Sequence, residues 1–144
     1  MEYEQPTPYI VESTDYKKEY PTPVLTAGKS FIIGYTNETT GIKRDLPVII
    51  FDDFTTESKY VDFPFKVKSS AMKILTANEK IVNVKFAFYA MQCVECDSYN
   101  HKRYWISEFS KKLIALPPLA EQCRIVQTVE ELYRYIDTSI KNSF

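Results

Sequence analysis

The most regular pattern of hydrophobic positions lies in the last quarter of the chain. Apolar residues recur there with spacings of four, three and four residues over roughly three heptads, which is the a/d spacing of a coiled-coil seam. The seam consists of Ile125, Val129, Leu132 and Ile136, with Gln122 and Ser139 extending the frame and Val126, Tyr133 and Ile140 beside it. Pro117 and Pro118 stand just before the pattern, where a helix tolerates missing N–H groups, so we predict a helix over residues 119–140. The periodicity fits either a coiled-coil helix or an amphipathic helix packed on its own domain.

Shorter apolar runs upstream predict strands, because they are rich in Val, Ile and aromatic residues and end at Pro, Gly or polar clusters. We predict strands at residues 6–11, 21–26, 31–35, 46–51, 60–67, 72–75 and 113–116. The first two begin with Pro-Thr-Pro and are predicted to be edge strands, whereas residues 46–51 are apolar throughout and should be buried on both faces. Residues 36–45 form a polar loop, and Asn83 is the predicted N-cap of a helix whose apolar stripe belongs to the core.

These elements predict one domain followed by an appended helix. The fold class is α/β (α+β-like), with a small twisted mixed sheet and short helices, followed by a long C-terminal coiled-coil helix. The predicted domain covers residues 1–116, and the spacer or dimerisation helix covers residues 117–144. A chain of 144 residues can bury a substantial core, and an aromatic content of 15% argues against disorder.

The net charge of −1 does not by itself indicate a nucleic-acid-binding protein, but the charge is unevenly distributed. Residues 1–60 hold 6 basic and 10 acidic side chains, whereas residues 61–115 hold 9 basic and 5 acidic ones. A locally basic face attracts phosphates even on a neutral protein. The polar, acidic first residues and the absence of an 18-residue apolar run predict a cytoplasmic protein without a membrane span. The three cysteines are expected to be reduced thiols.

Two short motifs contain residue types that catalyse reactions or bind metals. Asp52 and Asp53 follow a predicted strand, where they suit either acid–base or metal chemistry or, in the interpretation we favour, turn formation. Cys93 and Cys96 have the spacing of a redox pair or half a zinc site, but His101 is the only histidine and four ligands cannot be assembled. We therefore expect no catalytic residue and no bound metal.

Several sequence blocks resemble one known family. Leu-Pro-Pro-Leu-Ala-Glu-Gln at residues 116–122, followed by Arg-Ile-Val at residues 124–126, is similar to the junction motif of the specificity subunits of type I restriction–modification systems. Blocks at residues 34–37, 40–42, 50–55 and 65–70 resemble one branch of that family in the same order. The resemblance covers most of the chain and implies a target recognition domain joined to a spacer helix.

The resemblance implies sequence-specific recognition of double-stranded DNA by a non-catalytic subunit in a prokaryotic cytoplasm. Its partners would be methyltransferase subunits, which use S-adenosylmethionine, and motor–nuclease subunits of the restriction complex, which use ATP and Mg²⁺; no cofactor is expected in this chain. Family members usually carry two recognition domains and two spacer helices that pair antiparallel. One domain and one helix therefore predict a half-subunit that homodimerises through the helix, with residues 117–122 holding the junction and contributing to methyltransferase docking.

Candidate DNA contacts come from the polar loop, the segment after the strand at residues 60–67, and residues 99–105. The last segment mixes cations, amides and aromatics, which suits contacts with phosphates and base edges but also fits a solvated loop. The expected DNA contacts are Tyr35, Asn37, Thr39, Thr40, Lys43, Arg44, Lys66, Lys68, Ser69, Ser70, Asn100, His101, Lys102 and Arg103. The expected partner contacts on the helix are Leu119, Gln122, Ile125, Val129, Leu132, Ile136 and Ile140.

Two other functions remain open on the sequence alone. The chain could be a protein-interaction module, such as a decoy or regulator that pairs with a full-length specificity subunit without binding DNA. It could also be an enzyme that uses Asp52, Asp53 or His101. Salt-dependent DNA binding distinguishes the first function from DNA recognition.

Overall fold

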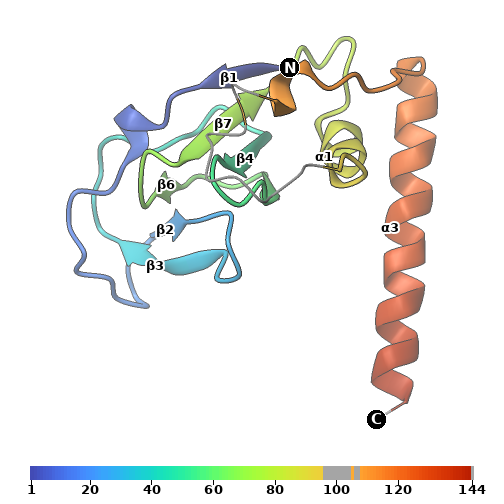
Figure 1. The fold of residues 1–144 in the computed structure, drawn as a ribbon. Helices are drawn as coiled ribbons and strands as arrows, with labels where there is room; N and C mark the ends of the chain where they lie inside the picture. The colour runs from blue at the N-terminus through green and yellow to red at the C-terminus, as the bar shows by residue number, and fades with distance from the viewer. Residues whose placement is uncertain (96–104, 106–107, 144) are drawn as a thin grey trace.

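The structure, a computed structural model, describes residues 1–95, 105 and 108–143. The elements are β1 (Glu2–Glu4), the 3₁₀ turn η1 (Thr7–Tyr9), β2 (Thr22–Leu25), β3 (Ile32–Thr36), β4 (Val48–Asp52), β5 (Ser58–Val61), β6 (Lys66–Val67), β7 (Met72–Thr76), α1 (Val84–Gln92), the 3₁₀ turn η2 (Phe109–Lys111) and α3 (Leu119–Asn142). Figure 1 shows a folded domain with α3 standing along one side of it, next to α1.

The strands form two sheets. One sheet has the order β1-β7-β4-β5 and is antiparallel throughout, whereas the other has the order β3-β2-β6, in which β2 pairs antiparallel with β3 and parallel with β6. The predicted fold class, with its mixed pairing and long C-terminal helix, is confirmed, and the strands divide between two small sheets.

Strand β4 separates two apolar cores. Val48 and Ile50 lie in a core shared with the three-stranded sheet, and Ile49 and Phe51 lie in a second core shared with α1. Successive side chains of a strand point to opposite faces, so one strand serves both cores. All four residues are fully buried, which confirms the predicted burial of this strand on both faces. The domain is therefore layered as three-stranded sheet, four-stranded sheet and α1.

Helix α1 begins where the sequence predicts. The Asn83 side-chain oxygen accepts a hydrogen bond of 3.1 Å from the backbone N–H of Phe86, which satisfies one of the unpaired donors of the first turn. Phe86, Ala87 and Met91 are buried, so the apolar stripe is part of the core as expected. Among the described helices, none combines the length and apolar character needed to cross a membrane.

The prediction of two proline-led edge strands is wrong. Residues 6–11 contain the turn η1, closed by a 2.8 Å hydrogen bond from the Tyr9 N–H to the Pro6 carbonyl. Proline fixes φ and lacks a donor, which favours such a turn over a paired strand. The second segment does form β2, but β2 is the central strand of its sheet.

Two further strand predictions also need correction. Residues 60–67 do not form one strand, because Pro64 cannot donate a ladder hydrogen bond, and the segment divides into β5 and β6 in different sheets. Residues 113–116 have a strand-like sequence but pair with no described strand. Exposed and apolar, this segment leads directly into α3.

Candidate nucleic-acid interface

The polar loop (residues 36–45) is closely packed against the domain although, after Thr36 at the end of β3, it forms no helix or strand. It returns to the domain at a bridge in which Lys43 and Phe65 exchange backbone hydrogen bonds of 2.9 and 3.3 Å. Gly41 has a φ of +61°, and a Cβ added there would lie 2.5 Å from the Pro8 carbonyl oxygen. Both the backbone conformation and the close approach to η1 therefore require glycine at the tip of the loop.

A polar network around the buried ammonium group of Lys66 supports the loop from beneath. Glu38 Oε1 accepts hydrogen bonds of 3.0 Å from the backbone N–H groups of Glu12 and Ser13, and Glu38 Oε2 lies 2.9 Å from Lys66 Nζ. The same ammonium group donates a 2.9 Å hydrogen bond to the Thr40 carbonyl. Burial alone would raise the pKa of the Glu38 carboxyl, but the N–H donors and Lys66 together hold that pKa below its ordinary value.

Lys43 and Lys66 are not on the exposed surface of the loop, which corrects two of the expected DNA contacts. Their side chains are only 4% and 3% exposed. Lys43 Nζ pairs with Glu4 Oε2 at 2.8 Å, and this hydrogen bond is the main reason that the pKa of the Glu4 carboxyl is lowered. A buried ammonium needs a carboxylate partner, so both lysines point inward to a glutamate instead of outward to a phosphate.

The remaining candidates of the loop are accessible, as is Tyr35 near the end of β3, just before the loop. Tyr35 is half-buried, and the exposed members are Asn37, Thr39, Thr40 and Arg44. Amide, hydroxyl and guanidinium groups are the side-chain types that form hydrogen bonds with base edges in the major groove. The structure thus separates the loop into supporting residues that face the domain and polar residues that face solvent.

Thr39 and Arg44 also line a surface groove. Its other wall includes Pro23, Phe63 and Pro64, so a cation and a hydroxyl stand beside an apolar surface. A guanidinium group suits guanine O6 and N7, and apolar side chains suit the methyl group of thymine. This groove adds an apolar component to the candidate interface.

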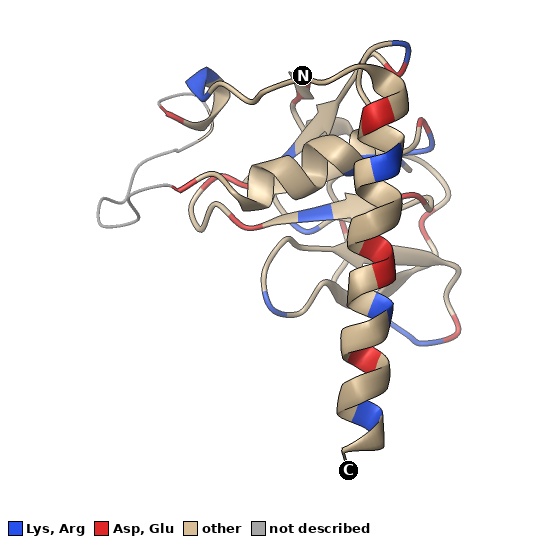
Figure 2. Ribbon diagram, turned by 90° about the vertical axis from the view of Figure 1, so that its right-hand side faces the viewer, with Lys and Arg blue, Asp and Glu red and all other residues tan. Residues whose placement is uncertain are grey.

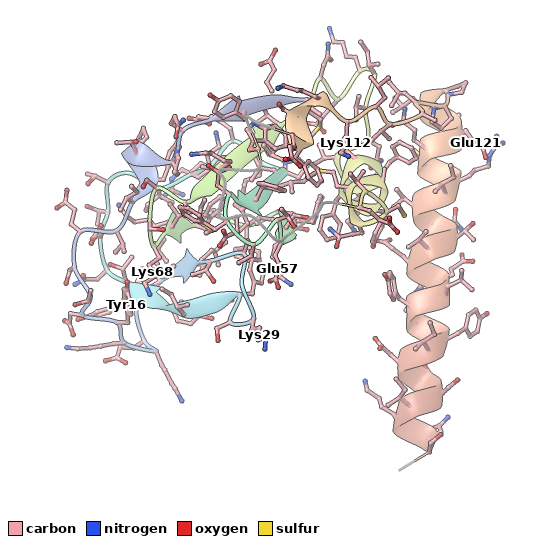
Figure 3. All side chains as sticks on the ribbon, viewed as in Figure 1. Tyr16, Lys29, Glu57, Lys68, Lys112 and Glu121 are labelled. Carbon is pink, nitrogen blue, oxygen red and sulfur yellow. The ribbon has the colours of Figure 1, made fainter. Side chains whose placement is uncertain are left out.

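The segment that follows β6 contributes a second, separate group of candidates. Lys68 and Ser70 are exposed and Ser69 is half-buried. The Lys68 N–H donates to the Leu25 carbonyl at 3.2 Å, which places it at the opposite end of β2 from Thr22, where the polar loop begins. The two groups are therefore about 10 Å apart along the sheet. Figure 3 shows Lys68 on the side of the domain away from α3.

The last group of expected DNA contacts, Asn100, His101, Lys102 and Arg103, lies outside the described residues, as does Cys96. Elsewhere, Figure 2 shows basic residues interspersed with acidic ones on both the domain and α3. The described part of the chain therefore offers local cationic groups.

The two adjacent aspartates have structural partners. Asp52 Oδ1 accepts hydrogen bonds from the N–H groups of Phe54 at 2.8 Å and Thr55 at 3.1 Å, which confirms the favoured role in turn formation. Asp53 is almost completely buried, and its Oδ2 lies 3.7 Å from Nζ of the equally buried Lys73. Within the described residues, no group of three His, Cys, Asp or Glu side chains is placed to hold a metal ion.

The junction between domain and helix depends on Gln122, which is fully buried. Its Oε1 accepts a 2.8 Å hydrogen bond from the Asn83 N–H, and its Nε2 donates to the carbonyls of Ile81 at 2.9 Å and Pro117 at 2.8 Å. These bonds tie the start of α3 to the start of α1. Gln122 is therefore not a surface contact for a partner subunit, which corrects that expectation.

Further along α3, one face packs on α1. Val126 is buried, Lys85 forms an ion pair with Glu130 at 2.5 Å, and the rings of Tyr89 and Tyr133 lie 6.1 Å apart. These contacts cover about the first half of the helix. The interpretation of an amphipathic helix packed on its own domain therefore describes this face of α3.

The C-terminal part of the predicted seam is exposed, and the described residues supply no partner for it. Ile125 and Val129 are half-buried beside the domain, but Leu132 is 56% exposed, and Ile136 and Ile140 are each 53% exposed. Figure 1 shows that this end of α3 extends beyond the domain. Packing on the domain accounts for one face of the helix, and the coiled-coil interpretation stays a prediction for the exposed face.

The sequence pattern does not predict the roles of Glu38, Lys85 and Glu130, which hold the polar loop and the helix in place. The available signal for Glu38 was weak: it is the single acidic residue between Ile32 and Arg44. Nothing in the local pattern connects it with Lys66, because the two residues meet only after β2 has brought β3 and β6 into one sheet.

Comparisons with known proteins agree with this geometry. The chain matches the family model of the type I restriction modification DNA specificity domain over residues 6–143. It is 47% identical over 140 residues to the type I restriction enzyme EcoR124I/EcoR124II specificity subunit of Escherichia coli, covering 94% of this chain and 35% of that protein. The fold is similar to that in the crystal structure of the HsdS subunit from Thermoanaerobacter tengcongensis, with a TM-score of 0.50 and 14% identity over 95% of this chain and 38% of that chain.

The chain thus spans little more than a third of the length of either relative. The family match covers both the domain and α3, and it confirms the resemblance found in the junction and upstream blocks. The chain belongs to the family of type I restriction–modification DNA specificity domains.

Proposed function

We propose that this chain recognises a specific sequence in double-stranded DNA, as the non-catalytic recognition part of a type I restriction–modification assembly. The polar loop is the observation that carries the proposal, because exposed Asn37, Thr39, Thr40 and Arg44 stand on a backbone held by the ion pairs of two buried lysines. Side chains on a preorganised backbone lose little entropy on binding and can discriminate between base edges. Lys68, at the other end of β2, would add a phosphate contact.

In this proposal the chemistry belongs to partner subunits. A methyltransferase partner would use S-adenosylmethionine, and a motor–nuclease partner would use ATP and Mg²⁺. The recognition domain would determine which DNA sequence is bound, and α3 would form the contacts between two copies of the chain. The proposal assigns the described carboxylates Asp52 and Asp53 to folding, in agreement with their hydrogen bonds and burial.

The first prediction tests the polar loop. Co-expression of the chain with its cognate methyltransferase subunit, followed by mapping of methylated bases in the host genome, should reveal one sequence motif. Asn37→Ala combined with Arg44→Ala should reduce methylation of that motif at least about 10-fold, because each lost base contact costs on the order of 1–3 kcal/mol.

The matched control is Lys59→Ala combined with Gln127→Ala. It removes one cation from β5 and one amide from α3, and it should leave methylation of the motif unchanged. Unaltered methylation in the Asn37/Arg44 variant would exclude the loop from the interface. Absence of any sequence preference in the unmodified assembly would overturn DNA recognition and favour a protein-interaction module.

We also propose that the start of α3 docks the methyltransferase subunit. Gln122 ties the carbonyls of Ile81 and Pro117 together, so the exposed apolar side chains of Ile81, Leu116 and Leu119 gather around one junction. Figure 3 shows Lys112 and Glu121 at the same end of α3. Clustered apolar residues with a polar rim are typical of protein interfaces.

The second prediction concerns this surface. Leu119→Asp should reduce recovery of the methyltransferase subunit in a pull-down at least about 10-fold, because a carboxylate would be desolvated in the contact. Ile32→Asp is the control, since Ile32 on β3 is 40% exposed and Leu119 is 36% exposed. Equal recovery with the Leu119 variant and the unmodified chain would show that docking occurs elsewhere.

A further inference from the structure

The ion pair between Lys66 and Glu38 joins three segments that are distant in sequence. Lys66 comes from β6, Glu38 from the polar loop, and the Glu38 carboxylate also binds the N–H groups of Glu12 and Ser13 in the segment after η1. The Lys66 side chain is 3% exposed, so a DNA duplex lying on the loop would have no direct access to the ammonium group. The pair therefore holds the loop from the side that faces the domain.

The chemistry of the pair indicates a role in conformation more than in stability. Desolvation of two charges largely offsets their attraction, and well-packed apolar replacements of such pairs are often neutral or stabilising. The hydrogen bonds are nevertheless directional. A single ammonium group holds both the Glu38 carboxylate and the Thr40 carbonyl, so it fixes the chain on both sides of Thr39.

We propose that Lys66 and Glu38 are positioning residues that set the base discrimination of the polar loop through the backbone that their ion pair holds. The proposal rests on the proposed function of this loop in DNA recognition. Asn37 and Thr39, which flank Glu38, are exposed and point their polar groups according to the backbone that the pair holds. Without the contact to Lys66, the loop would keep its side chains but hold them in several orientations. The difference in affinity between the correct and an incorrect DNA sequence would therefore become smaller.

The test compares the unmodified protein with the variant Lys66→Met/Glu38→Gln in the assembled methyltransferase complex. Glutamine retains an oxygen for the N–H groups of Glu12 and Ser13, and the double change leaves no unpaired buried charge, so the domain should fold. Fluorescence anisotropy measures the affinity for the duplex found by methylation mapping and for an unrelated duplex. We expect the ratio of the two affinities to fall about 10-fold or more, with the affinity for the unrelated duplex changed less than about 2-fold.

Two further measurements separate positioning from a merely structural role. Amide hydrogen exchange at Thr40 and Gly41 should become faster in the variant, whereas the thermal midpoint should remain close to that of the unmodified protein. The control Lys85→Met/Glu130→Gln removes the ion pair between α1 and α3 and should leave the affinity ratio unchanged.

An unchanged ratio in the Lys66/Glu38 variant would overturn the positioning role, and so would an equal loss of affinity for both duplexes accompanied by unfolding. The proposed function is judged separately. If the Asn37→Ala/Arg44→Ala variant lowers the ratio and the Lys66/Glu38 variant does not, only the positioning role fails. If the unmodified complex shows no preference between duplexes, both proposals fail.

Discussion

Asp53→Ala should lower the free energy of unfolding by about 3–5 kcal/mol, the range for removing one partner of a buried ion pair. The expected loss follows from the burial of both charges, since the side chains of Asp53 and Lys73 are nearly inaccessible. Asp53 Oδ1 also accepts a 2.9 Å hydrogen bond from the backbone N–H of Trp105. Among the described residues, the substitution would leave the Lys73 ammonium only the neutral oxygens of Gln5 and Ser70, at 3.2 and 3.3 Å.

Denaturant unfolding followed by the fluorescence of Trp105, the single tryptophan, measures this effect. Asp52→Ala is the natural control, because that neighbouring carboxylate is partly exposed and makes only turn hydrogen bonds; its loss should be about 1 kcal/mol. Asp53→Leu/Lys73→Met should recover much of the stability, since it leaves no unpaired charge. A loss for Asp53→Ala no larger than that for Asp52→Ala would contradict a stabilising buried pair.

Leu132→Asp combined with Ile136→Asp should convert a dimer into a monomer, with the dissociation constant raised at least about 1,000-fold by carboxylates buried in an apolar seam. The unmodified chain, of 16.8 kDa, should sediment as a homodimer. Both positions are more than half exposed in the single chain, so the substitutions should leave the domain and its packing on α1 intact. Analytical ultracentrifugation measures the association, and circular dichroism verifies that helix content is retained.

Gln127→Asp/Thr138→Asp is the matched control, since it adds the same charge to the same helix outside the seam and should preserve the dimer. Sedimentation of the unmodified chain as a monomer at high micromolar concentration would contradict homodimerisation. It would leave the exposed seam to a different subunit.

An antiparallel dimer has a consequence for the DNA site. Helix α3 has 24 residues, so at ~1.5 Å per residue it is about 36 Å long, close to one turn of B-DNA. A two-fold dimer would therefore place two polar loops toward successive major grooves on one face of the duplex. We expect the methylated motif to be an inverted repeat interrupted by a nonspecific gap.

The elements whose signals are local could be predicted from the amino-acid sequence. The start of α3 was predictable because Pro117 and Pro118 exclude a preceding helical turn, and the start of α1 because Asn83 caps its own helix. The burial of β4 was predictable because an uninterrupted apolar run is typical of a strand covered on both faces. The family was also recognisable, since its sequence blocks follow one another in the correct order.

The direction in which the polar and charged side chains point could not be predicted in this way, because it depends on contacts between segments distant in sequence. Lys66 and Arg44 are both cations near the polar loop, yet Lys66 is buried against Glu38 while Arg44 is exposed. Gln122 occupies a seam position, yet it turns inward because the backbone groups of Ile81 and Asn83, 41 and 39 residues away in sequence, need its amide. Hydrophobic periodicity predicts which face of a helix or strand is buried. The direction of a single polar side chain depends instead on hydrogen-bond partners that folding brings together.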